Sequence, residues 1–367
     1  MDRFAFIIHP INPKKDVSRK YPLLGRVLNE RQINFFSTFF PPVYISEITG
    51  IVSAASGKEI GGWFVACPFT PQRMMELPVN TVYRKIVQTG RMAEKLGARM
   101  LGLGAYTSVV GDAGVTIADR LEIPVTTGDA LTIGMAVEAL AKAARVMEIE
   151  AKTATAAVVG ATGAIGQVCA ELLAEQVQHL FLIGRREDRL QQMRQQLAVQ
   201  GCAAVIDIST DMQSLARADL VLTVTNDVHA VIDPEHLKSG SVVCDVARPR
   251  DVSARVAAVR QDVLVIDGGM VAVPGPVDFH FDFGFPPGSA YACMAETMAL
   301  ALEGRFEDYT LGKSISRQRV QEISTIARRH GFRLSGFRSF EQAVTEAQIS
   351  RIKDHIRRGA QFHVVST

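Results

Sequence analysis

Residues 156–166 read Ala-Ala-Val-Val-Gly-Ala-Thr-Gly-Ala-Ile-Gly, a short apolar run followed by glycines at 160, 163 and 166. From Gln167 to Val177 the pattern is helical. In a dinucleotide-binding turn the first glycine permits the sharp bend, the second lets the backbone approach a pyrophosphate, and the third lets helix and strand pack closely. The helix N-terminus adds positive dipole for the phosphates. This context favours a nucleotide site over an ordinary glycine-rich loop, with these candidate contacts: Gly160, Thr162, Gly163, Ala164, Ile165 and Gly166.

The end of the next apolar run indicates which dinucleotide binds. That run, His179–Ile183, is followed by Gly184, Arg185 and Arg186, and the first acid after it is Glu187. An NAD site usually places Asp or Glu here to accept a hydrogen bond from the ribose 2′-hydroxyl, whereas a guanidinium group suits a 2′-phosphate. We therefore predict NADPH as the cofactor. The alternative is that the two arginines are solvated residues that open the next helix.

Apolar runs alternate with helical patterns through the second half of the chain. The predicted strands there are Thr155–Val159, His179–Ile183, Ala203–Ile208, Leu220–Thr225, Ser241–Val246 and Val263–Ile266. Alternation of this kind predicts an α/β fold with a Rossmann-type, doubly wound parallel sheet. Nearer the N-terminus, strands at Phe4–Ile8, Gly62–Ala66 and Met100–Gly104 and a helix at Thr81–Leu96 predict a separate α/β domain.

These patterns divide the chain into four expected segments. Residues 1–128 form an α/β substrate-binding domain, 129–152 a connecting helix, 153–287 the NADP(H)-binding domain, and 288–367 C-terminal helices that pack back on both domains. The predicted C-terminal helices are Ser289–Glu303, Ser316–His330 and Phe340–Arg358.

Composition describes an ordinary globular protein, with 47% hydrophobic and 21% charged residues in a chain of 367. The five cysteines show no C-x-x-C spacing, which favours reduced thiols in a cytoplasmic protein and argues against a zinc or disulfide framework. The apolar run at the N-terminus is too short for a signal peptide, and no run approaches the length that spans a bilayer. We expect no metal and no nucleic-acid partner.

Positive charge gathers in the C-terminal segment, where eleven Lys or Arg residues after position 312 face four Asp or Glu. In the last predicted helix, Ile349, Ile352 and Ile356 follow the spacing of one apolar stripe, which predicts packing on the protein or on a second subunit. The outward arginines would then suit an acidic partner or anionic lipid headgroups, so a homo-oligomer and a peripheral membrane contact both stay open. A solvated basic face is the simpler explanation of the same charges.

Ligands of open α/β sheets bind beyond the carboxyl ends of the strands. In this chain Thr225 and Asn226 follow one predicted strand, and Gly268 and Gly269 follow another. The first pair would contact the ribose or nicotinamide, and the second would let the nicotinamide approach the backbone. Ordinary turn chemistry accounts for the same residues.

Cys293 lies in Gly-Ser-Ala-Tyr-Ala-Cys, with Ser289 as the expected N-cap, so the thiol falls about one turn into a helix. A helix N-terminus lowers the pKa of a thiol and favours the nucleophilic thiolate. The alternative is a buried cysteine packed in the core. His280, within an aromatic stretch, is a candidate acid/base partner or an ordinary structural histidine.

Hydroxyl groups follow two predicted elements of the first domain. Tyr106, Thr107 and Ser108 come after the strand at 100–104, and Thr126 and Thr127 precede the long helix that begins near Asp129. Both sets would face a domain cleft, where pockets usually form, and the hydroxyls at 106–108 are candidate donors to an oxyanion. N-capping and turn formation are the alternatives.

Taken together, these segments resemble the cyanobacterial long-chain acyl-acyl carrier protein reductases. The resemblance covers roughly residues 40 to 333. It rests on the ordered motifs Glu47-Ile48-Thr49, Ser56-Gly57-Lys58, Arg84-Lys85, Leu103-Gly104-Ala105-Tyr106-Thr107-Ser108, Thr126-Thr127-Gly128, residues 158–166, Asp267-Gly268-Gly269, Ala292-Cys293-Met294-Ala295-Glu296 and Arg329-His330-Gly331-Phe332.

The resemblance implies that Cys293 attacks a fatty acyl thioester and that NADPH reduces the acyl-enzyme to a fatty aldehyde. It implies an acyl carrier protein or acyl coenzyme A as the donor of the acyl group. Two alternatives stay open: a dehydrogenase of the shikimate dehydrogenase kind that acts without covalent catalysis, with Lys85 as base, and a protein that senses NADP(H) without catalysis.

Overall fold

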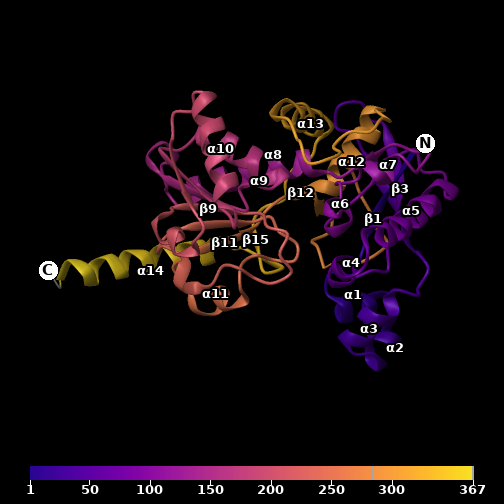
Figure 1. Cartoon of the computed structure of the whole chain (residues 1–367), viewed down its shortest axis with the longest axis horizontal. Coiled ribbons are helices and arrows are strands. Elements are labelled where there is room, and N and C mark those ends of the chain that lie inside the picture. Colours follow the sequence, from indigo (N-terminus) through magenta and orange to yellow (C-terminus); the bar gives the residue numbers. More distant parts are fainter. Residues whose placement is uncertain (283, 366–367) are drawn as a thin grey trace. The chain divides into compact units, whose positions relative to one another are not determined.

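The computed structural model describes residues 1–282 and 284–365, and it divides the chain into two compact units. The first unit contains residues 1–131 and 271–335, and the second contains residues 132–270 together with the chain from 336 onward. The end of the second domain differs from the predicted one, because residues 271–287 lie with the first unit. The C-terminal region is divided between the two units at residue 335. Figure 1 shows the elements of each unit in chain order.

The second unit is built on a six-stranded parallel sheet in the order β11-β10-β9-β6-β7-β8. The strands are β6 (Thr155–Val159), β7 (His179–Ile183), β8 (Val205–Ser209), β9 (Leu220–Thr223), β10 (Val242–Asp245) and β11 (Leu264–Asp267). The four central strands bury nearly every side chain, as expected of a parallel sheet covered on both faces. This strand order is that of a Rossmann sheet and confirms the predicted fold class.

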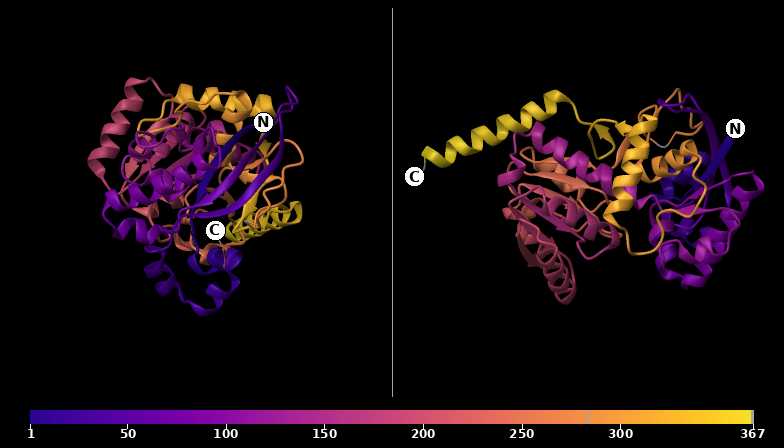
Figure 2. Two further views of the ribbon diagram at one scale, coloured as in Figure 1. Left: turned by 90° about the vertical axis from the view of Figure 1, so that its right-hand side faces the viewer. Right: turned by 90° about the horizontal axis from the view of Figure 1, so that it is seen from above.

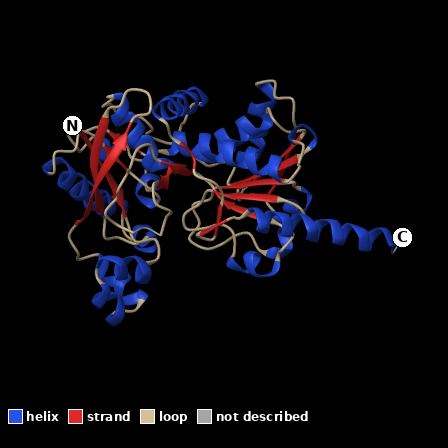
Figure 3. Cartoon of the chain, turned by 180° about the vertical axis from the view of Figure 1, so that it is seen from behind, coloured by secondary structure: helices blue, strands red, loops and turns tan. Residues whose placement is uncertain are grey.

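Helices and short helical turns precede the first of these strands and connect the others, as Figure 3 shows in blue around the red sheet. They are α8 (Asp129–Val146), η1 (Ala151–Thr153), α9 (Ala164–Ala174), α10 (Glu187–Val199), η2 (Met212–Arg217), η3 (Pro234–His236) and α11 (Ala254–Val259). α8 begins in the first unit and continues into the second. Asp129 is its first residue, as the sequence predicts.

The first unit has a five-stranded sheet in the order β2-β3-β1-β4-β5. Its strands are β1 (Asp2–Ile8), β2 (Val43–Val52), β3 (Glu59–Ala66), β4 (Leu101–Gly102) and β5 (Val125–Thr126). Only β2 runs antiparallel, so β1, β3, β4 and β5 share one carboxyl edge. The helices that cover the sheet include α5 (Val79–Lys95) and α12 (Ala292–Glu303), which packs across β1, β3 and β4.

Short helices fill the connections of this unit, and the sequence patterns do not predict them. They are α1 (Pro13–Lys20), α2 (Pro22–Val27), α3 (Glu30–Ser37), α4 (Pro71–Glu76), α6 (Tyr106–Val109) and α7 (Val115–Ala118). Local capping defines several of them: the Asn12, Asn29 and Thr70 side chains each accept a hydrogen bond from a backbone N–H of the first turn. Helices of so few residues carry little periodic signal.

The C-terminal elements differ in part from those predicted. α13 (Arg317–His330) agrees with the predicted helix, with Ser316 as its N-cap residue. α12 starts at Ala292 and not at the expected Ser289, because residues 289–291 form strand β13 (Ser289–Tyr291). β13 lies beside β12 (Met270–Ala272), whose other neighbour is β14 (Arg333–Leu334). Two strands, β15 (Arg338–Ser339) and β16 (Gln342–Ala343), form a hairpin before α14 (Glu346–Val365).

α14 packs by the predicted apolar stripe. Ile352 is buried, Ile349 and Ile356 are half-buried, and Arg351 and Arg357 are exposed. The stripe reaches the second unit, because a Cβ atom on Gly240 would lie 3.6 Å from Cδ1 of Ile356. Figure 2 shows this helix in yellow from two further directions. Within the described chain, no helix is both long and apolar enough to cross a bilayer.

Candidate functional site

The glycine turn after β6 has the geometry that its sequence predicts. Gly160 has φ +80°, and a Cβ atom there would lie 2.6 Å from the carbonyl oxygen of Val224. A Cβ atom on Gly166 would lie 2.2 Å from the carbonyl oxygen of Gly160, so the third glycine permits the close packing of α9 against the turn. Gly163 is the N-cap residue of α9, which places the free N–H groups of that helix at the carboxyl edge of the sheet.

The two arginines after β7 are exposed and differ in their contacts. Arg186 is the N-cap residue of α10, and its guanidinium pairs with Asp188 at 2.8 Å. Arg185 comes directly after Gly184, where a Cβ atom would lie 3.7 Å from Oγ1 of Thr162 in the glycine turn. Thr162 and the loop that carries Arg185 therefore adjoin, so Arg185 is the better placed of the two arginines to meet an adenosine ribose.

The remaining predicted cofactor residues lie at the same sheet edge, but one of them, Thr225, already makes hydrogen bonds within the protein. Thr225 donates its hydroxyl to Asp251 at 2.5 Å and its backbone N–H to the same carboxylate at 2.8 Å. Asn226 is exposed. Gly268 and Gly269 form a buried turn after β11, and Gly269 has φ +80°. Because glycine has no side chain, this turn presents only backbone atoms at the edge of the sheet.

Cys293 is the second residue of α12 and is half-buried. It packs directly on the turn between β5 and α8, because a Cβ atom on Gly128 would lie 2.3 Å from Cα of Cys293 and 2.5 Å from its Cβ. Gly128 also has φ +76°, which glycine adopts without strain. Cys67, Cys169 and Cys244 are buried, so among the free thiols only Cys293 and Cys202 have partial exposure.

The expected lowering of the Cys293 pKa is not found. Burial is the largest cause, and together with the negative charges of Asp129 and Glu296 it raises the pKa of this thiol to about 12. Backbone N–H groups of Cys293 and Met294 favour the thiolate, but they do not outweigh burial. The resting group is therefore the thiol, and a nucleophilic role requires a base that removes its proton during attack.

Two buried carboxyl groups adjoin this cysteine. Glu296 is fully buried and accepts hydrogen bonds from the Thr126 hydroxyl at 2.5 Å, the Thr310 hydroxyl at 2.7 Å and the Leu131 N–H at 2.8 Å. Asp129 is 6% exposed, and burial, together with the charge of Glu296, raises the pKa of Asp129 to about 7. A carboxyl group with that pKa can accept and return a proton near neutral pH.

His9 lies at the same carboxyl edge, directly after β1. It is 8% exposed, and burial lowers the pKa of its ring to about 4, although the backbone of Pro10 opposes this effect. Its Nε2 accepts the backbone N–H of Tyr106 at 3.0 Å, so the neutral ring carries its proton on Nδ1. Nδ1 has no hydrogen-bond partner among residues 1–282 and 284–365. His9 is thus a neutral donor held at the edge.

The loop after β4 is strained at the same place. Ala105 has φ +48°, which a residue with a side chain rarely adopts. Tyr106 follows it, is 5% exposed and donates its hydroxyl to Sδ of Met75 at 3.3 Å. Thr107 and Ser108 donate their hydroxyls to the carbonyls of Gly104 and Ala105 at 2.8 and 2.7 Å, so these hydroxyl protons stabilise the turn.

The structure does not bring His280 to Cys293. His280 is half exposed, its Nδ1 lies 3.2 Å from the carbonyl oxygen of Glu47 on β2, and the neighbouring Asp278 pairs with Thr49 of that strand. β2 and β5 are the two edges of the sheet, four strand spacings or about 19 Å apart. Lys85, the base of the dehydrogenase alternative, donates to the carbonyl of Phe40 at 2.8 Å.

Sequence reasoning missed three residues of this site: His9, Asp129 and Glu296. Glu296 stands in the Ala-Cys-x-Ala-Glu motif, one helical turn after Cys293, and Asp129 directly follows the Thr-Thr-Gly motif, so both had a local signal. His9 had the signal of a polar residue directly after an apolar strand. Among the described residues, no group of three or more His, Cys, Asp or Glu side chains could hold a metal ion.

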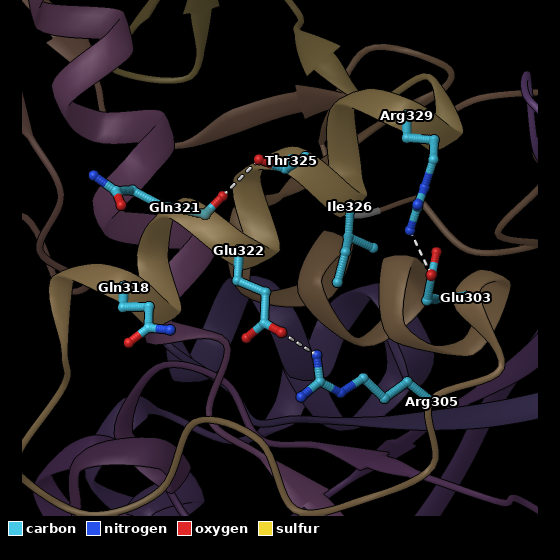
Figure 4. A pocket seen from close by; sticks show the side chains of 8 residues that line it. All are labelled: Glu303, Arg305, Gln318, Gln321, Glu322, Thr325, Ile326 and Arg329. Atoms are coloured by element: carbon cyan, nitrogen blue, oxygen red, sulfur yellow. Dashed lines mark hydrogen bonds and ion pairs between the residues drawn. The ribbon is translucent and has the colours of Figure 1, made fainter.

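A separate pocket of about 480 Å³ opens between the end of α12 and α13. The charged side chains that line this pocket form ion pairs, as Figure 4 shows: Arg305 pairs with Glu322 at 2.5 Å, and Arg329 pairs with Glu303. Glu303 lies ten residues after Cys293 on α12, about 15 Å along the helix axis. This pocket is therefore distinct from the surroundings of Cys293.

Comparison with known proteins supports the fold and the reaction class. Residues 141–267 match the family model of shikimate / quinate 5-dehydrogenase, and this range contains the glycine turn and all six strands of the second unit's sheet. The long-chain acyl-[acyl-carrier-protein] reductase of Synechococcus elongatus is 28% identical over 83% of this chain and 90% of its own length. Aminotransferase PigE of a Serratia strain is 28% identical over 96% of this chain, but the chain spans only 42% of that protein.

Among solved structures, L-tryptophan dehydrogenase from Nostoc punctiforme covers 98% of this chain and 89% of its own, with a TM-score of 0.41 and 11% identity. The fold of the second unit and the matched dehydrogenase model are those of NAD(P)-dependent oxidoreductases that use a nicotinamide cofactor.

Proposed function

We propose that this protein reduces an acyl thioester, carried by an acyl carrier protein or coenzyme A, to an aldehyde with NADPH, through an acyl group held on Cys293. The observation that carries the proposal is the setting of Cys293: a half-buried thiol in the first turn of α12, packed on Gly128 at a sheet edge that also holds a buried carboxyl group titrating near neutrality. The reductase relative, aligned over 90% of its length, supports the thioester substrate.

In the first step Asp129 removes the proton of the Cys293 thiol as the sulfur attacks the thioester carbonyl. The new carbon–sulfur bond forms while the bond to the carrier sulfur breaks, and the proton held by Asp129 leaves with the carrier thiol. Asp129 suits this role because it is buried beside the thiol and because its raised pKa makes it a stronger base than an ordinary carboxylate. Glu296, committed to three donors, holds the surrounding turns in place.

The negative charge that develops on the carbonyl oxygen needs donors. The backbone N–H groups of Cys293 and Met294 lie in the first turn of α12, where they lack intrahelical partners, and His9 offers Nδ1–H at the same sheet edge. These groups replace the hydroxyls of Thr107 and Ser108 as the proposed oxyanion donors, because those hydroxyls donate to carbonyls of their own turn.

When bound, NADPH supplies the hydride that converts the acyl group to the aldehyde. The overall reaction consumes one thioester, one NADPH and one proton, and it yields aldehyde, free carrier thiol and NADP⁺, so Cys293 is regenerated. The glycine turn would hold the pyrophosphate, and Arg185, adjoining Thr162, would hold the 2′-phosphate.

Intact-mass measurement after incubation with an acyl coenzyme A, without NADPH, tests the proposal. Wild-type protein should gain the mass of one acyl group, mapped to Cys293 by peptide analysis, and Cys293→Ser should gain none. Cys202→Ser is the matched control, because Cys202 is the other partly exposed thiol. NADPH oxidation with no acyl adduct on any residue would instead support a dehydrogenase that works without covalent catalysis.

A further inference from the structure

The first helices of the chain present an unusually apolar outer surface. We define the N-terminal helical lobe as residues 13–40, which contains α1, α2, α3 and the three residues that follow. Large hydrophobic side chains of this lobe are exposed: Tyr21 43%, Leu23 74%, Val27 78%, Phe35 54%, Phe36 41%, Phe39 71% and Phe40 41%. The ring centroid of Phe35 lies 5.4 Å from that of Phe36 and 5.8 Å from that of Phe39, so these rings form one exposed aromatic cluster.

The inner face of the lobe is fixed to the first unit by polar contacts. On α3, Ile33 and Ser37 are buried, and Asn34 accepts a hydrogen bond from Thr70 at the start of α4. Arg73 of α4 donates to the Thr38 hydroxyl at 2.8 Å. A capping box between Asn29 and Gln32 defines the start of α3. The phenylalanines therefore face outward because α3 has a fixed orientation, and not because the segment lacks structure.

Charge on the lobe is mostly positive. Lys14, Lys15, Arg26 and Arg31 are exposed, and Glu30 is the exposed acid beside them. The second acid of the lobe, Asp16, pairs with Arg19 at 3.1 Å. The lobe thus combines exposed aromatic and aliphatic side chains with an excess of exposed cations. Figure 1 shows α1, α2 and α3 grouped together, to one side of the sheet of the first unit.

We propose that the N-terminal helical lobe binds the surface of an anionic lipid bilayer. Aromatic and aliphatic side chains of such a surface enter the boundary between headgroups and acyl chains, while Lys and Arg reach the lipid phosphates. Protein interfaces are also rich in aromatic residues and Arg but are depleted of Lys, so the exposed Lys14 and Lys15 favour the lipid surface. This inference does not rest on the proposed reaction.

The lobe also adjoins the carboxyl edge of the sheet. α3 contacts α4, and Met75 on α4 is 59% exposed while its sulfur accepts the Tyr106 hydroxyl. Tyr106 in turn contacts His9 through its backbone N–H. A bilayer bound at the lobe would therefore lie close to the edge where the His9 ring is held.

Co-sedimentation with vesicles tests the proposal in the full-length protein. Vesicles of phosphatidylcholine and phosphatidylglycerol in equal parts should bind the protein, and binding should weaken with added salt or in phosphatidylcholine alone. Phe35→Ser/Phe39→Ser should weaken binding at least about tenfold, and so should Arg26→Glu/Arg31→Glu. Val199→Ser/Val259→Ser is the matched control, since these exposed valines lie on helices of the second unit.

Arg351→Glu/Arg357→Glu on α14 tests the rival basic surface. Loss of binding in that variant, with normal binding in both lobe variants, would overturn the proposal and assign the contact to α14. The proposal would also be overturned if the wild-type protein does not bind anionic vesicles but binds an acidic acyl carrier protein through Arg26 and Arg31. The thermal midpoint of each variant should match that of the wild type, which shows that a loss of binding does not come from a loss of folding.

Discussion

Gly128 is in backbone contact with Cys293: a Cβ atom on the glycine would lie 2.3 Å from Cα of the cysteine and 2.6 Å from its carbonyl oxygen. The turn that ends β5 and the first turn of α12 therefore fix each other. Because Gly128 also has φ +76°, any other residue here meets both backbone strain and a steric clash.

Gly128→Ala should lower the free energy of unfolding by at least about 2 kcal/mol, since strain and overpacking each cost about 1–3 kcal/mol. Urea denaturation measures this change. Gly57→Ala is the control, because Gly57 has φ +67° but open space around its Cβ position, so it reports the strain alone. Equal losses in the two variants would show that contact with Cys293 adds nothing.

Asp129→Asn should move two rates in opposite directions. Acyl transfer to Cys293 should fall at least about a hundredfold because the base is lost. Alkylation of Cys293 by iodoacetamide should become faster at the same pH, because removal of a negative charge lowers the pKa of the thiol. Mass spectrometry of the Cys293 peptide measures both rates. If acyl transfer is unchanged, Asp129 is not the base.

Asp129 and His9 should make opposite contributions to the pH dependence of stability. The Asp129 pKa rises from 3.8 to about 7 on folding, so the folded state holds the extra proton and loses stability as pH rises through this window. The His9 pKa falls from 6.5 to about 4, so the folded state excludes the proton and loses stability as pH falls through its window.

The two contributions oppose each other between about pH 4 and 6.5, and single variants should separate them. Relative to wild type, Asp129→Asn should gain stability toward pH 7, and His9→Gln should gain stability toward pH 4, each by a difference on the order of 3 kcal/mol across its window. Urea unfolding at several pH values measures these differences. Parallel stability curves for wild type and either variant would contradict the shift assigned to that residue.

Arg185→Ala should weaken NADPH binding about tenfold to a hundredfold, because one charge-assisted contact to the 2′-phosphate is lost. NADH affinity should hardly change. Fluorescence titration of both cofactors measures the effect, with Arg189→Ala as the control for an exposed arginine nearby. A smaller change is expected for Arg186→Ala, whose guanidinium is paired with Asp188. Wild-type preference for NADH would contradict the cofactor assignment.

His280→Ala should leave acyl transfer to Cys293 within about twofold of wild type, because His280 lies by β2, at the opposite edge of the sheet from Gly128. Single-turnover acylation measures this rate. A loss comparable to that of Asp129→Asn would mean that His280 reaches the thiol in the working enzyme.

Local patterns were enough to predict the glycine turn after β6. The spacing of Gly160, Gly163 and Gly166 between an apolar strand and a helix reflects steric demands within one βαβ unit, and those demands act over a few residues. For the same reason the sequence predicted all six strands of the second unit, α8 and, to within one residue, α13. Period and capping are local physical signals.

The surroundings of Cys293 depend instead on contacts between distant parts of the chain. Its thiol pKa is raised first by burial of the thiol and then by two carboxyl groups, which residues 126–131 and 293–310 bury beside it when they come together. These effects outweigh the helix dipole that the local sequence suggests. His9 reaches the same edge because β1 pairs with β4, and His280 is taken to the far edge because Asp278 pairs with Thr49. Desolvation and charge proximity depend on three-dimensional packing, so no local motif encodes them.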